Sequence, residues 1–171
     1  ERLLGVSMTG IMDNKYTNGK LGDLPGLLEE LKAEAVRVNA ELSKKLGINQ
    51  SVAITCVKPS GTVSQLVDAA SGIHARHNPF YIRTVRGDKK DPLTQFMISK
   101  GFPVEDDQMN PSQTVVFSFP VKVDKGAVFR TDMSAIEQLE MWLIYQKHWC
   151  EHKPSVTISV KEHEWMEVGA W

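Results

Sequence analysis

The sequence predicts an α/β fold. Short β-branched or aromatic stretches alternate along the chain with segments in which apolar residues recur every three or four positions. The most apolar stretch, residues 51–57, shows no polar alternation, which is typical of a strand buried on both faces of a parallel sheet. No repeat or linker interrupts the 171 residues, so we expect one domain over residues 1–171.

The helices are predicted from periodicity and from their end signals. Leucines recur at helical spacing after Asp23, a candidate N-cap, and the pattern stops at Gly47. Ser134 and Glu137 have the spacing of a capping box, at the start of a helix that runs to about residue 149. Three shorter helical segments are expected to begin near residues 62, 91 and 162.

Four further strands are predicted from β-branched and aromatic content, at residues 3–8, 80–85, 114–123 and 155–160. Pro120 places its strand at a sheet edge or at a bulge, because proline has no amide hydrogen for a ladder. Trp142, Tyr145 and Trp149 fall at helical spacing and are expected in the core.

Composition excludes several functional classes. Twenty basic residues face 21 acidic ones, a net charge of −1, so no global field attracts the chain to nucleic acid or to an anionic membrane. No apolar run is long enough to cross a bilayer. The two cysteines, Cys56 and Cys150, lie far apart and indicate a reducing, cytoplasmic compartment rather than a disulfide framework. We expect neither thiol to act as a nucleophile.

The segment Lys58–Ser64 is the strongest candidate for a binding site. It follows a buried strand and precedes a helical segment, which is where open α/β sheets and barrels place their ligands. Unpaired amides, a glycine that lets the backbone approach closely and three hydroxyl groups suit a phosphate. The alternative is that Ser60 and Thr62 only cap a helix and that Gly61 serves a turn.

Two other polar groups have both a functional and a structural interpretation. A basic stretch supports polyphosphate binding or forms a solvated face, and its members are His74, Arg76, His77, Arg83, Arg86, Lys89 and Lys90. His148 and His152 are four residues apart, with His163 downstream. Because the motif HExxH is absent and Pro154 ends the helix nearby, we expect no metal site there.

Residues 54–66, Ile-Thr-Cys-Val-Lys-Pro-Ser-Gly-Thr-Val-Ser-Gln-Leu, resemble the adenosylcobalamin-dependent (class II) ribonucleotide reductases, particularly the monomeric ribonucleoside-triphosphate reductase type. The resemblance continues through residues 71–77 and 79–86, and includes residues 5–10 and 150–160. One departure is Ala75, where the family has proline between the histidine and the arginine.

This resemblance implies that the chain is the C-terminal part of a ten-stranded α/β barrel, and therefore a fragment of a larger enzyme. It implies that one loop holds the substrate phosphates, formed by Pro59, Ser60, Gly61, Thr62, Val63 and Ser64. The catalytic cysteines and carboxylate of the family belong to motifs that this chain lacks, so no catalytic residue is expected in it. The implied cofactor is adenosylcobalamin.

The implied partners are a ribonucleotide substrate, the missing N-terminal part of the barrel, and thioredoxin or a similar dithiol reductant. Neither a membrane nor a nucleic acid is expected as a partner. Two alternatives to this function stay open. One is a stand-alone nucleotide- or phosphate-binding module without catalysis, and the other is a metal hydrolase centred on His148, His152 and His163.

Overall fold

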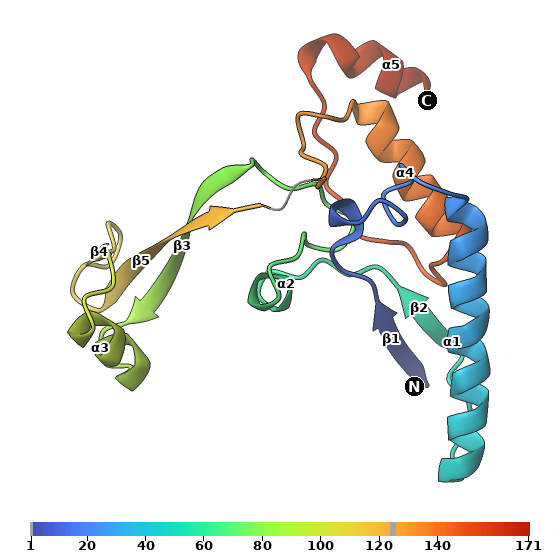
Figure 1. Cartoon of the computed structure of the whole chain (residues 1–171), viewed down its shortest axis with the longest axis horizontal. Coiled ribbons are helices and arrows are strands. Elements are labelled where there is room, and N and C mark those ends of the chain that lie inside the picture. The colour runs from blue at the N-terminus through green and yellow to red at the C-terminus, as the bar shows by residue number, and fades with distance from the viewer. Residues whose placement is uncertain (1, 124–125) are drawn as a thin grey trace. The chain divides into compact units, whose positions relative to one another are not determined.

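The computed structural model describes residues 2–123 and 126–171. The chain forms two compact units, which are described separately (Figure 1). The first contains residues 1–77 and 124–171, and the second contains residues 78–123. Both helices and strands are present, so the predicted α/β class is confirmed. The single domain over residues 1–171 and the ten-stranded barrel stay predictions.

The sheet of the first unit has two parallel strands, β1 (Leu3–Ser7) and β2 (Ala53–Cys56). Both had been predicted, and their parallel pairing requires the long crossover that α1 (Leu24–Leu46) supplies between them. Three of the four β2 residues are buried, whereas all five β1 residues are exposed. The faces of β1 are therefore uncovered in this chain.

The two long helices begin and end where the sequence indicates. In α1, Pro25 lies in the first turn, and Gly47 ends the helix with a left-handed φ of 66°. In α4 (Ala135–His148), the Ser134 hydroxyl accepts from the Glu137 amide at 3.2 Å, and the Glu137 carboxylate accepts from the Ser134 amide at 2.7 Å. The predicted capping box is thus confirmed.

The core of the first unit lies where α4 contacts α1 and the loops that follow β1 and β2. Tyr145 and Trp149 are 0% and 3% exposed, and Trp142 packs against the same cluster, so the three predicted core aromatics are confirmed. The Trp149 indole donates to the Cys56 carbonyl at 2.7 Å, which ties the end of α4 to β2. The other buried members are Ile11, Met12, Leu24, Leu28, Val57, Ala70, Ile73, Val128 and Cys150.

The second unit is a three-stranded antiparallel sheet in the order β3-β5-β4, with one helix. Its elements are β3 (Phe80–Asp88), α3 (Pro92–Ser99), β4 (Val104–Asp106) and β5 (Thr114–Lys122). The sequence predicted all of these except β4. Pro120 pairs with Ile82 in a regular register, beyond the part of β5 that β4 covers, so it occupies a local edge and needs no bulge.

Two predictions are wrong in extent or type. Residues 155–160 form no strand, because no described strand pairs with them, although Val156, Ile158 and Val160 alternate as half-buried residues with exposed neighbours. The helix predicted from Thr62 is limited to the four residues of α2 (Val63–Leu66). The last predicted helix is present as η2 (Glu162–Glu164) followed by α5 (Trp165–Ala170), and η1 (Ile11–Asp13) had not been predicted.

Candidate phosphate-binding loop

The loops after β1 and β2 meet at one end of the sheet. Because the two strands are parallel, their carboxyl ends lie at the same edge. The Gly10 amide donates to the Ala70 carbonyl at 2.7 Å, and the Thr9 hydroxyl donates to the same carbonyl at 2.9 Å. The Gly72 amide in turn donates to the Thr9 hydroxyl at 3.2 Å. Residues far apart in the sequence are thus joined beside the candidate loop.

Hydrogen bonds within the loop and to neighbouring segments fix the loop that follows β2. The Lys58 amide donates to the Ser7 hydroxyl at 2.9 Å, and the Ser60 amide donates to the Ser71 hydroxyl at 2.8 Å. The Ser64 amide donates to the Ser60 hydroxyl at 2.8 Å, while the Ser64 hydroxyl donates to the Ser60 carbonyl at 2.7 Å. The two serines therefore close the loop on itself.

The six predicted residues of this loop differ in exposure. Pro59, Gly61, Thr62 and Val63 are exposed, Ser60 is half-buried, and Ser64 is completely buried. In the conformation described, the Ser64 hydroxyl and amide brace the loop and do not face solvent.

The exposed part of the loop keeps donors for a ligand. Within residues 2–123 and 126–171, the amides of Thr62 and Val63 and the Thr62 hydroxyl have no hydrogen-bond partner. A β-carbon built on Gly61 meets no atom within 4 Å, so space is open on that side of the backbone. The four-residue α2 is too short for a substantial macrodipole.

Arg76 is not available for a polyphosphate in this structure. It is 6% exposed, and its guanidinium donates to both carboxylate oxygens of Asp13, at 2.9 and 3.0 Å. It also binds the Asp68 carboxylate at 3.1 Å and the Asp68 carbonyl. The interpretation of Arg76 as part of a basic binding stretch is therefore corrected, because its charge is neutralised by two aspartates.

The rest of the basic stretch is divided between the two units. Arg86 pairs with Asp107 at 2.8 Å and Lys89 pairs with Asp106 at 2.6 Å, both inside the second unit. The arginine beside Asp107, assisted by the amides of the following residues, lowers the pKa of that carboxyl group. These pairs favour the structural interpretation of this stretch.

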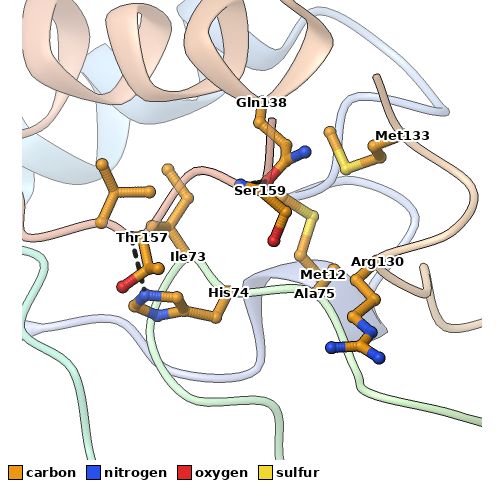
Figure 2. A pocket seen from close by; sticks show the side chains of 10 residues that line it. Met12, Ile73, His74, Ala75, Arg130, Met133, Gln138, Thr157 and Ser159 are labelled. Atoms are coloured by element: carbon orange, nitrogen blue, oxygen red, sulfur yellow. Dashed lines mark hydrogen bonds between the residues drawn. The ribbon is translucent and has the colours of Figure 1, made fainter. Parts of the chain in front are cut away.

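His74 joins two segments beside a small cavity in the first unit (Figure 2). Its Nδ1 lies 2.9 Å from the Ser71 carbonyl oxygen, and its Nε2 accepts from the Thr157 amide at 3.1 Å. The cavity has a volume of about 150 Å³ and is lined by apolar side chains together with Arg130, Gln138 and Ser159. Sequence reasoning named His74 but assigned it no partner, and it did not single out Ser71.

The two thiols are buried, and His148 is engaged by a carboxylate. Cys56 and Cys150 are both buried free thiols, and burial raises the pKa of the Cys150 thiol to about 11. His148 Nδ1 lies 2.7 Å from a Glu29 carboxylate oxygen on α1. Within the described part of the chain, no three histidine, cysteine or acidic side chains are grouped so as to hold a metal ion.

The fold and the loop sequence correspond to one class of protein. A solved structure of a B12-dependent (class II) ribonucleotide reductase matches with a TM-score of 0.73 and 29% identity, over 85% of this chain and 21% of that chain. No family model matches the sequence.

Curated relatives make the likeness more specific. The adenosylcobalamin-dependent ribonucleoside-triphosphate reductase of Euglena gracilis is 32% identical over 158 residues, which cover 92% of this chain and 22% of that protein. The enzyme of the same name from Lactobacillus leichmannii is 27% identical over 191 residues, covering 95% of this chain and 26% of its own length. The chain is homologous to one segment of these reductases, so the predicted resemblance is confirmed.

The match is partial on the side of the relatives. The chain spans between a fifth and about a quarter of the length of the curated relatives. For the probable adenosylcobalamin-dependent ribonucleoside-triphosphate reductase of Dictyostelium discoideum, the share is 21%. None of the described helices has both the length and the apolar character needed to span a membrane.

Proposed function

We propose that this chain is a segment of the catalytic barrel of a class II ribonucleotide reductase, and that it holds the phosphates of the ribonucleotide. The observation that carries the proposal is the loop at the carboxyl end of β2, where exposed residues keep donors that have no partner among the described residues, in a sequence homologous to these reductases. The whole enzyme would convert ribonucleotides to 2′-deoxyribonucleotides by thiyl radical chemistry in the cytoplasm, and this segment alone would be inactive.

The six loop residues have different proposed roles. The Thr62 and Val63 amides and the Thr62 hydroxyl donate to phosphate oxygens, and Gly61 allows the phosphate to approach the backbone. Pro59 restricts the backbone where the loop leaves the strand. Ser60 and Ser64 keep the loop in shape through their mutual hydrogen bonds, so that the donors are already oriented when the anion arrives.

The cofactor of the whole enzyme would be adenosylcobalamin, as in the names of the relatives. When bound, it supplies the radical that starts the reaction. In this structure His74 and His148 are not free to bind cobalt, because both ring nitrogens of His74 are hydrogen bonded and His148 is bonded to Glu29. We assign the radical cysteine and the reducing cysteines to other parts of the enzyme, because the family motifs that carry them are absent from this sequence.

The proposed partners are the preceding part of the barrel and a thioredoxin-type dithiol reductant. An open apolar cavity of about 630 Å³ between α1 and β1 supports the first of these. Leu4, Val6, Leu31, Leu42 and Leu46 line it and are each more than 40% exposed. Exposed apolar surface of this kind is typical of a face that another segment covers.

The substitution Gly61→Val in the full-length reductase tests the function. The β-carbon enters open space and the backbone at Gly61 does not have a left-handed φ, so the fold should be unaffected. The valine side chain would keep phosphate away from the loop, and we expect affinity for a nucleoside triphosphate to fall by about tenfold or more, equal to about 1.4 kcal/mol.

Gly169→Val is the matched control, because the β-carbon at this glycine also meets no atom within 4 Å and the residue lies in α5, away from the loop in sequence. It should leave affinity unchanged. Unchanged affinity in the Gly61→Val protein would remove the phosphate role from the loop. Tight nucleotide binding by a monodisperse isolated chain would instead favour a stand-alone binding module.

A further inference from the structure

A turn formed by residues 71–74 packs directly against the candidate phosphate-binding loop. The Ser71 hydroxyl accepts from the Ser60 amide at 2.8 Å, across eleven positions of sequence. A β-carbon built on Gly72 would lie 3.1 Å from the Lys58 carbonyl oxygen, and Gly72 has a left-handed φ of 54°. The turn therefore contacts the loop at two points, and a side chain at residue 72 would force them apart.

The His74 ring holds this turn from the other side. A backbone carbonyl only accepts and a backbone amide only donates, so the two contacts of the ring determine its protonation. Nδ1 carries the hydrogen that is donated to the Ser71 carbonyl at 2.9 Å, and the unprotonated Nε2 accepts from the Thr157 amide at 3.1 Å (Figure 2). The ring is thus neutral and in one tautomer.

The contacts form a continuous path from the extended segment 155–160 to the loop. The Thr157 amide donates to the His74 ring, and the ring donates to the Ser71 carbonyl. The Ser71 hydroxyl in turn accepts from the Ser60 amide. Ser60 then accepts two hydrogen bonds from Ser64, one from its amide and one from its hydroxyl. The ring is half-buried among Met12, Ile73 and Val156, whereas Thr157 is exposed, so the contact of the ring with the Ser71 carbonyl is the better shielded of its two hydrogen bonds.

We infer that Ser71 and His74 are positioning residues for substrate phosphate, which set the shape of the loop at residues 59–64 without touching the ligand. This inference rests on the proposed function. The Ser60 amide is occupied by Ser71, whereas the amides of the exposed residues Thr62 and Val63 have no partner among the described residues. Loss of the hydrogen bonds from His74 to Ser71 and from Ser60 to Ser71 should therefore weaken the binding of phosphate and leave the chemical step unchanged.

The test compares KM with kcat for a nucleoside triphosphate in the full-length reductase. Ser71→Ala removes the acceptor of the Ser60 amide, and His74→Ala removes both ring contacts. Each substitution should raise KM by about fivefold, which corresponds to the free energy of about one hydrogen bond, and should leave kcat unchanged. His74→Asn keeps a donor near the position of Nδ1 and should restore KM to within about twofold of wild type.

His74→Gln is the matched variant that keeps a polar atom near the position of Nε2 and not of Nδ1. It should behave like His74→Ala, because the contact with Ser71 is the one that reaches the loop. If Ser71→Ala leaves KM unchanged while Gly61→Val raises it, the inference is overturned and the proposed function stands. If Gly61→Val also leaves KM unchanged, the proposed function itself fails.

A fall in kcat with unchanged KM for Ser71→Ala would also overturn the inference. Where His74→Ala does not yield folded protein, the Ser71→Ala and His74→Asn results decide, since the serine is small and half-buried and the asparagine keeps the donor. A KM that rises in Ser71→Ala and is near wild type in His74→Asn supports the assignment.

Discussion

The carboxylate of Glu151 accepts from the backbone amide of Thr55 at 2.9 Å, and the Glu151 amide donates to the Thr55 carbonyl at 3.1 Å. The same carboxylate oxygen accepts from the Ile54 amide at 2.5 Å. A residue that follows α4 thus binds the backbone of β2 directly ahead of the candidate loop. Its hydrogen bonds help to determine where the loop begins.

Glu151→Gln should destabilise the chain by about 1 kcal/mol, because an amide oxygen is a weaker acceptor than a carboxylate and the site is partly exposed. The measurement is urea-induced unfolding of dilute protein. Glu162→Gln is a suitable control, since no hydrogen bond from the Glu162 side chain is found among the described residues, and it should change the midpoint little. Equal midpoints for Glu151→Gln and wild type would contradict this prediction.

Acid should weaken the fold through the same carboxylate. Partial burial raises the pKa of Glu151, but the hydrogen bonds from the Thr55 and Ile54 amides outweigh this effect. The pKa of Glu151 in the folded protein is therefore below the ordinary value of 4.5. A lowered pKa in the folded state adds stability above pH 4.5 that is lost as the pH falls through the folded-state pKa. The melting temperature should fall below that pH, and less steeply in Glu151→Gln.

Arg76→Met should destabilise the chain by about 3 kcal/mol, because it leaves Asp13 and Asp68 without their common partner. Arg130→Met is the matched control, since Arg130 is exposed and has no ion pair among the described residues. Thermal unfolding of both variants gives the comparison. If Arg76→Met were as stable as the control and bound phosphate more weakly, Arg76 would return to the list of binding residues.

Native protein should resist thiol reagents. Both cysteines are buried, and the raised pKa of Cys150 leaves almost no thiolate at neutral pH. Alkylation by iodoacetamide at pH 8 should be about a hundredfold slower than in urea, with mass spectrometry locating the adducts. Rapid modification of either cysteine in the native state would show that its environment is more open than described.

The sequence predicted the elements whose signals are local. The ends of α1 and α4 follow from Gly47 and from the Ser134–Glu137 capping box, which act within one turn of the chain. The strand at 155–160 was wrongly predicted, because alternation describes a half-buried extended segment equally well, and a strand also requires a neighbour. β4 was missed because its three residues include two acids.

The candidate site was predictable in the same partial way. The loop at residues 59–64 could be found because a glycine and hydroxyl residues follow an apolar strand. The burial of Ser64, the ion pairs of Arg76 and the contact of Ser71 with Ser60 depend on how separate loops meet, and no local pattern reports that. The brace from His74 to Thr157 spans 83 positions and is likewise a product of tertiary structure.

The open side of β1 has a practical consequence for handling this protein. β1 pairs with β2 on one side and, among the described strands, with none on the other, while its five residues are all exposed. Such a row of amides and carbonyls is a template on which a second polypeptide can add. Bacterial production of the segment alone should favour inclusion bodies, and co-expression with the complementary piece of the enzyme should shift it into the clarified lysate.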